Sequence, residues 1–172
     1  MAGDPANVHV WVTGDVYIFD PDVAYVAGTH LPADIDTALH AAWLPAGLMK
    51  GDPGVEMPRN IDKTDLNAWQ RKRFKTTYKN AKKDANFTLF EDNEVTEYLI
   101  DEANVPAAKP ARLAMVFVGD DGYTKRLFTK TKADLWVTAE NKKEDPDGYP
   151  VEVSLYPDNT GAIFTIQKGI PA

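Results

Sequence analysis

Apolar and polar side chains alternate along many short stretches of this chain, with the two-residue period of a half-buried β-strand. The first stretch runs from Val8 past Gly14 to Phe19, and Gly14 is expected at a bulge or a close backbone approach. Asp121-Gly122 predicts a hairpin with a type I′ turn. Further strands are expected at residues 73–79, 86–90, 113–118, 125–129, 133–138, 151–156 and 162–167. This pattern predicts a mainly β protein, a β-sandwich or barrel.

One or two short helices are expected to pack on the side of this β fold. Residues 35–43 place their apolar side chains on one face at helical spacing, and Pro45 would end that helix. A second, acidic helix is expected after residue 91, with Asp92 or Asn93 as its N-cap. Its buried side is expected to carry Val95, Tyr98 and Leu99.

A long loop is expected at residues 47–67. Pro53 and Pro58, together with two glycines between residues 51 and 54, would interrupt any regular element there. Loops longer than about 12 to 15 residues inside a compact domain are usually functional or mobile. This loop is therefore the first place to expect a partner.

Length and composition indicate one turn-rich domain that covers residues 1–172. The chain has 12 prolines and 11 glycines, and its apolar and charged fractions of 44% and 26% are ordinary for a globular protein. It has no cysteine, which excludes disulfides, thiolate metal sites and cysteine nucleophiles. No stretch approaches the ~20 apolar residues of a membrane span, and the first ten residues do not resemble a secretory leader. We expect a protein that is made in the cytoplasm and has no membrane partner.

The charges are strongly segregated along the chain. The net charge is −7, but the segment from Lys63 to Lys83 holds eight basic residues and one acid, Asp65, so it carries +7 and leaves −14 on the rest. Its strand, residues 73–79, should have an apolar and a cationic face before a break at residues 80–84. A basic patch on an acidic body can bind nucleic acid. It can equally be half of a self-complementary contact between copies of the chain.

The residues of catalysis are sparse. His9, His30 and His40 are scattered without an HxH or HxxxH pair, and no P-loop, GxSxG or GxGxxG motif is present. The acidic clusters lack the regular spacing of a calcium loop and are explained by turns and helix caps. The sequence predicts no enzyme, no metal and no cofactor.

Six short stretches occur in an order and spacing that resemble a known family. They are VTGDVY from Val12, GTHLPAD from Gly28, AAW from Ala41, DLNAWQ from Asp65, FTLFE from Phe87 and GYPV from Gly148. In this order the chain, from about Val8 to Gly169, resembles the major tail tube proteins of long-tailed (siphovirus-type) bacteriophages, particularly those that infect actinobacteria. It departs from the simplest family pattern in its strongly basic segment, residues 71–83.

The resemblance implies a structural virion protein with a β-sandwich tail-tube fold. Such subunits form hexameric rings whose inner sheets join into one barrel, and the rings stack into a non-contractile tube around a tape measure protein, closed by a tail terminator. DNA leaves through the lumen during genome ejection without specific binding. The family has no catalytic residues to transfer, and the protein would be made in the host cytoplasm and located in the phage tail.

Three sets of residues are the candidate sites under this hypothesis. Expected at the subunit or ring interface are Lys63, Asp65, Trp69, Arg71, Lys72, Arg73 and Lys75. The long loop is expected to contact the next ring through Gly51, Asp52, Glu56, Arg59 and Asp62, with Trp43 and Trp69 as anchors in the subunit core. The alternative function is a nucleic-acid- or carbohydrate-binding β-sandwich module, and the basic strand could face a neighbour, the solvent or the lumen.

Overall fold

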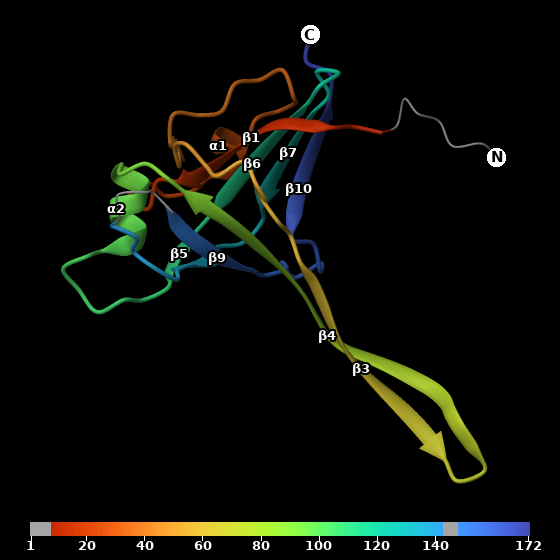
Figure 1. Ribbon diagram of the computed structural model, residues 1–172. Helices are drawn as coiled ribbons and strands as arrows, with labels where there is room; N and C mark the ends of the chain where they lie inside the picture. The colour runs from red at the N-terminus through yellow and green to blue at the C-terminus, as the bar shows by residue number, and fades with distance from the viewer. Residues whose placement is uncertain (1–7, 143–147) are drawn as a thin grey trace.

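Two antiparallel sheets of five strands each pack face to face as a β-sandwich (Figure 1). A computed structural model describes residues 8–142 and 148–172, with the backbone alone for residues 71–74. The mainly β fold that the alternating pattern predicted is confirmed. Most of the expected strands are present with their ends shifted by a few residues, but those expected at 73–79 and 86–90 are parts of one strand.

The first sheet contains the strand at the start of the described chain and the strand at its end. Its members are β1 (Trp11–Phe19), β2 (Trp43–Pro45), β6 (Leu113–Gly119), β7 (Thr124–Thr129) and β10 (Phe164–Gly169). They are ordered β10-β7-β6-β1-β2, and every neighbouring pair is antiparallel.

The second sheet includes the longest strand, β4. Its members are β3 (Arg59–Ala68), β4 (Arg71–Leu89), β5 (Lys109–Ala111), β8 (Ala133–Val137) and β9 (Tyr149–Leu155), in the order β3-β4-β9-β8-β5. The two helices are α1 (Ala27–His30) and α2 (Glu94–Ile100). Neither is long and apolar enough to cross a lipid bilayer, and the same holds for any helix among the described residues.

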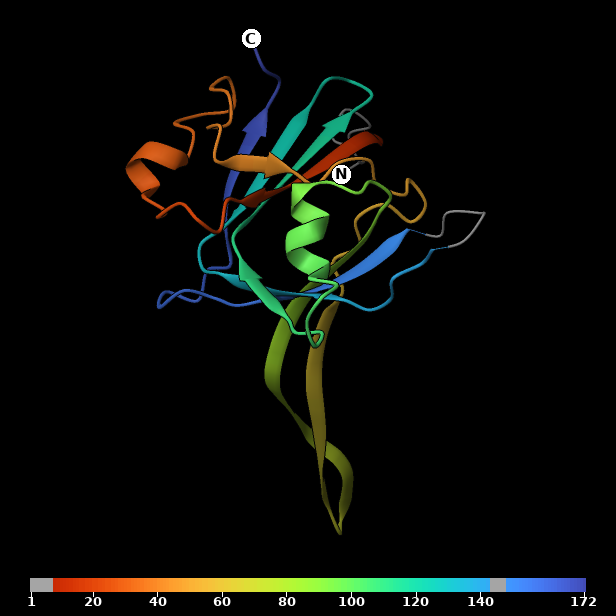
Figure 2. The same cartoon turned by 90° about the vertical axis from the view of Figure 1, so that its left-hand side faces the viewer.

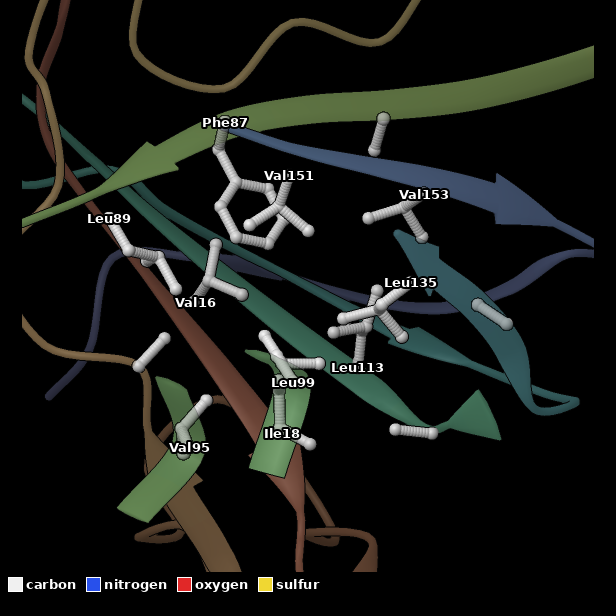
Figure 3. Packing of buried hydrophobic residues seen from close by; sticks show 14 of the residues in the cluster. Val16, Ile18, Phe87, Leu89, Val95, Leu99, Leu113, Leu135, Val151 and Val153 are labelled. Atoms are coloured by element: carbon white, nitrogen blue, oxygen red, sulfur yellow. The ribbon is translucent and has the colours of Figure 1, made fainter. Parts of the chain in front are cut away.

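The core lies between the sheets and is closed at one end by α2 (Figure 3). Alternate side chains along the facing strands supply it, as expected of a two-residue period. The labelled members are Val16, Ile18 and Leu113 from the first sheet, Phe87, Leu89, Leu135, Val151 and Val153 from the second, and Val95 and Leu99 from α2. Each such side chain contributes about 1.5–3 kcal/mol when it is fully buried.

Helix α2 begins where the sequence predicted it. The side chain of Asn93 accepts hydrogen bonds from the backbone N–H of Val95 at 3.0 Å and of Thr96 at 3.1 Å, and Thr96 Oγ1 accepts one from the Asn93 N–H at 2.7 Å. This reciprocal capping box satisfies backbone donors that the first turn leaves free. The N-cap is therefore Asn93, and the helix ends at Asp101 in the left-handed region, with φ 48°.

The helix predicted at residues 35–43 is wrong. That segment is irregular until β2, although its apolar residues are used as anchors. Leu39 and Trp43 pack with Phe19 in a second, smaller cluster on the outer face of the first sheet, and the Trp43 Nε1–H donates to the carbonyl of His30 at 2.8 Å. The apolar spacing thus reflects contacts with the sheet and not a helical face.

Two predictions about glycines need correction. Gly14 pairs in regular register, and the irregularity falls between Trp11 and Thr13. A Cβ at Gly14 would lie 3.1 Å from the Phe117 ring, so this position is a close approach to a side chain. The predicted hairpin at Gly122 is confirmed, but its turn is not type I′. That turn needs two central residues with positive φ, and only Gly122 of the expected pair has one, at 78°.

Candidate functional site

The most unusual feature is a two-stranded β-hairpin that projects far from the sandwich, as Figures 1 and 2 show from two sides. It consists of β3 and the first part of β4, and residues 59–83 are here called the arm. Strand β3 pairs only with β4, and β4 pairs with β9 only from Lys83 to Leu89. Ten strand residues extend about 30 Å, so the tip lies well beyond the body.

The arm corrects the expected loop at residues 47–67, because residues 59–68 are a strand. Their sequence is polar on both faces, so it lacks the alternation of a half-buried strand. Cross-strand contacts support it instead. The Thr76 hydroxyl donates to Asp65 Oδ1 at 2.7 Å, and Lys63 Nζ lies 6.0 Å from the centre of the Tyr78 ring.

The break expected at residues 80–84 is also wrong, because β4 continues through it. The register shifts between Asn60 and Asp62, opposite Asn80, which has φ 52°. The Asn80 side-chain amide donates to Asp62 Oδ2 at 2.8 Å. A bulge at a residue that tolerates the left-handed region therefore replaces the expected break and bends the arm.

Trp69 stands at the tip of the arm and is 100% exposed. The expectation that it anchors a loop in the subunit core is therefore wrong. Trp43, the other expected anchor, is 3% exposed and does lie in the body. A large aromatic side chain that is bare at the end of a projection is unusual and marks a candidate contact site.

The arm is basic, and the rest of the chain is acidic. Residues 59–83 hold nine lysines and arginines and two aspartates, so the arm carries +7 and the remainder −14. At its base, Lys83 Nζ lies 4.9 Å from the centre of the Phe164 ring. Partial burial, and then the nearby charges of Arg59 and Lys125, lower the pKa of Lys83. Like charges thus already crowd the base of the arm.

The structure separates the predicted interface residues. Lys63 and Asp65 lie on one face of the arm, because they pair with Tyr78 and Thr76, whereas Lys75 pairs with Leu66 on the other face. The backbone of Arg71, Lys72 and Arg73 lies in β4 next to the tip, and their side chains are outside the described part of the structure.

The residues predicted for the stacking loop are also divided between two places. Arg59 and Asp62 lie on the arm. Gly51, Asp52 and Glu56 lie on the body in the segment before β3, where the Glu56 and Asn86 backbones exchange hydrogen bonds of 2.9 and 2.8 Å.

A groove of about 760 Å³ opens beside the outer half of β1. The rings of Trp11 and Phe117, with centroids 6.0 Å apart, form part of its wall. Leu48, which is 68% exposed, also lines it. Other apolar lining side chains are Val12, Met49, Val55, Met57 and Leu127, and the charged ones are Asp15, Lys50, Glu91 and Lys125. Sequence reasoning missed this groove because its residues come from five separate segments of the chain.

The first sheet has two incompletely paired edges. Among residues 8–142 and 148–172, strand β10 has only β7 as a neighbour, and β2 covers only Tyr17–Phe19 of β1. Within the described residues, Trp11–Asp15 of β1 therefore pair on one side only. An unpaired strand edge offers backbone donors and acceptors to another strand.

Several titratable groups in the described part of the chain have shifted pKa values. Several aspartate pKa values are lowered because these carboxylates accept hydrogen bonds from nearby side chains or backbone N–H groups in turns; the residues are Asp34, Asp101, Asp121 and Asp158. Over residues 8–142 and 148–172 no group of three or more His, Asp or Glu side chains could hold a metal ion.

Comparison with protein-family models and with curated proteins finds no match for this chain.

Proposed function

We propose that the protein is a structural subunit that assembles into rings, and that these rings stack into the tail tube of a long-tailed bacteriophage. The observation that carries this proposal is the combination of a sheet with two unpaired edges and a projecting basic arm on an acidic body. Both features are suited to contacts between copies of the chain. The sequence resemblance described above supports the same function.

The two edges of the first sheet suit closure into a ring. The neighbours in β10-β7-β6-β1 are all antiparallel, so β10 runs opposite to β1. If β10 of one copy lies beside the outer half of β1 in the next, the antiparallel alternation continues across the boundary. Such a head-to-tail contact closes into a ring when its rotation permits, and closure would pair β10 and the outer half of β1 in every copy.

The arm suits contact between rings. Its tip is too far from its own body to fold back onto it, and it carries charge of the opposite sign to the body. It can therefore reach a different copy, where opposite charges favour docking in one register. We therefore assign the contact between rings to the whole hairpin, residues 59–83, and no longer to a loop at residues 47–67.

The resemblance supplies the biological setting of this proposal. Six copies at −7 each would carry −42, and a mainly acidic channel would repel DNA and let it slide. The partners would be further copies of the chain, a tape measure protein inside the tube and a tail terminator at its end. The protein would be located in the virion tail.

Size-exclusion chromatography with light scattering, over a concentration series, and negative-stain electron microscopy test this proposal. We expect large species and rings or tubes. Ile166→Lys adds a charge to a half-exposed position on β10 and should prevent ring closure, whereas Val105→Lys, at an 88% exposed position outside the sheets, should not. A strict monomer at every concentration, with no tubes after long incubation, would overturn the proposal.

Binding of nucleic acid is the second candidate, and the basic arm with an exposed aromatic tip favours it. The acidic remainder opposes it, because it repels a polyanion within the ~8 Å Debye length at physiological salt. Fluorescence anisotropy with labelled duplex and single-stranded DNA at about 0.15 M salt separates the two functions. Tight binding that Lys75→Glu and Lys79→Glu abolish would favour this candidate.

A further inference from the structure

We propose that the groove between β1 and residues 45–57 is the receptor for the arm tip of a second copy of the chain, with Trp69 as the inserted side chain and the backbone edge of β1 left to β10 of the ring neighbour. This inference rests on the proposed function in assuming that copies of the chain meet through the arm. It adds the acceptor site and the residue that enters it.

The Trp69 side chain is not covered by any part of its own subunit that the structure describes. It is fully exposed at the end of a hairpin that points away from the body in both views. Tryptophan is among the residues that most often dominate binding energy at interfaces, when it is enclosed in a pocket at the centre of the contact. An indole that is bare in the single subunit is therefore expected to be covered by another molecule.

The groove has the size and lining that an indole requires. Its volume of about 760 Å³ lies in the range of pockets that enclose compact ligands. Trp11 and Phe117 are in contact with their rings tilted by 59°, and a third aromatic ring can pack edge to face against this pair. Met49 and Met57 add flexible thioether side chains that adapt to the shape of a guest.

The polar groups of the groove also match an indole. The indole N–H is a donor without an acceptor, and the carboxylates of Asp15 and Glu91 line the groove as acceptors. Glu91 is held close to Gly47, where a Cβ would collide with its carboxylate. A side chain at position 47 would displace this acceptor.

Charge complementarity identifies the occupant as the arm of another copy. The lining alone is balanced, since Lys50 and Lys125 accompany the two carboxylates. Its rim adds Asp52 and Glu56, both exposed and both next to lining residues. Basic positions 71–73 follow the tip directly, so insertion of Trp69 would bring the most basic part of the chain to the acidic body, close to Asp52 and Glu56.

The cysteine-free sequence allows a direct cross-linking test. Protein with Gln70→Cys, which leaves Trp69 in place, is mixed with protein carrying Leu48→Cys, and a short bis-maleimide is added. The mixture is imaged by negative stain and digested for mass spectrometry. We expect a peptide that joins positions 70 and 48. Val105→Cys replaces Leu48→Cys in the control, because it is an exposed position that does not line the groove.

A further pair of variants tests the role of the indole. Trp69→Ala in the Gln70→Cys protein should lower the yield of the 70–48 peptide at least about tenfold, as expected for a dominant interface tryptophan. Trp136→Ala removes another partly exposed indole, on β8, and should leave the yield unchanged. A yield for the 70–48 pair that equals that of the 70–105 pair, or that is insensitive to Trp69→Ala, would overturn the inference.

The outcomes separate the groove from the tube. Tubes without the 70–48 peptide would retain the proposed function and reject the groove as receptor. The peptide without tubes would establish the contact and reject the tube. Native mass spectrometry of the same sample provides one more criterion, since a bound small molecule or a different protein in the groove would overturn the inference.

Discussion

Asn80 on β4 donates a hydrogen bond of 2.8 Å from its side-chain amide to the Asp62 carboxylate on β3. The bond lies where the register of the arm shifts, and Asn80 has φ 52°, a conformation that few residues other than glycine adopt readily. We expect Asn80→Val to weaken the arm by about 1–2 kcal/mol of backbone strain, and Asn80→Gly to weaken it less. Hydrogen exchange of residues 59–83 measures this, and equal protection in both variants would contradict it.

The two tryptophans first expected to act alike should behave oppositely. Trp43→Ala removes a buried side chain and should lower the free energy of unfolding by about 3–5 kcal/mol. Trp69→Ala changes a fully exposed side chain and should alter it by less than about 0.5 kcal/mol while it reduces assembly. Thermal denaturation and light scattering measure the two effects, and a strongly destabilised Trp69→Ala protein would contradict this prediction.

Assembly should depend on the positive charge of the arm. Lys75→Glu combined with Lys79→Glu changes the arm from +7 to +3, so attraction to the acidic body of a neighbour is reduced and the number of rings or tubes should fall. Raising the salt concentration should have the same direction of effect on the unmodified protein, because exposed charges are screened. Lys132→Glu, at an exposed lysine away from the arm, is the control and makes half of this change in net charge. An equal loss in the control would indicate a general effect of net charge.

Asp158 should make the stability of the monomer sensitive to acid. Hydrogen bonds from the Thr160 hydroxyl and the Ala162 N–H lower its pKa, and Lys130 Nζ lies 3.2 Å from Oδ2. A lowered folded-state pKa means that this stabilisation is present above the unfolded value of about 3.9 and is lost as pH falls through the folded value. Asp158→Asn should therefore unfold more easily at pH 7, with a difference from the unmodified protein that shrinks below about pH 4. Urea unfolding at a series of pH values measures it, and a constant difference would contradict the prediction.

The sequence by itself determined the features that depend on neighbours along the chain. The alternation of apolar residues predicted the mainly β fold and the core strands, because side chains on one face of a strand recur every two residues. The N-cap was predictable to within one residue, Asp92 or Asn93, because capping is a contact between residues three apart, and the structure identifies Asn93. The segregation of charge into a +7 segment was also visible, although its location on a projecting arm was not.

Only the tertiary structure decided which surfaces are covered. Residues 59–68 have no apolar period, and they form a strand because residues 71–83 pair with them. Residues 35–43 have helical spacing, yet contact with the outer face of the first sheet holds them in an irregular path. Trp43 and Trp69 are the same residue type and each follows an alanine, yet one is buried and the other is bare. Burial depends on segments distant in sequence, so no local pattern could distinguish the anchor from the exposed tip.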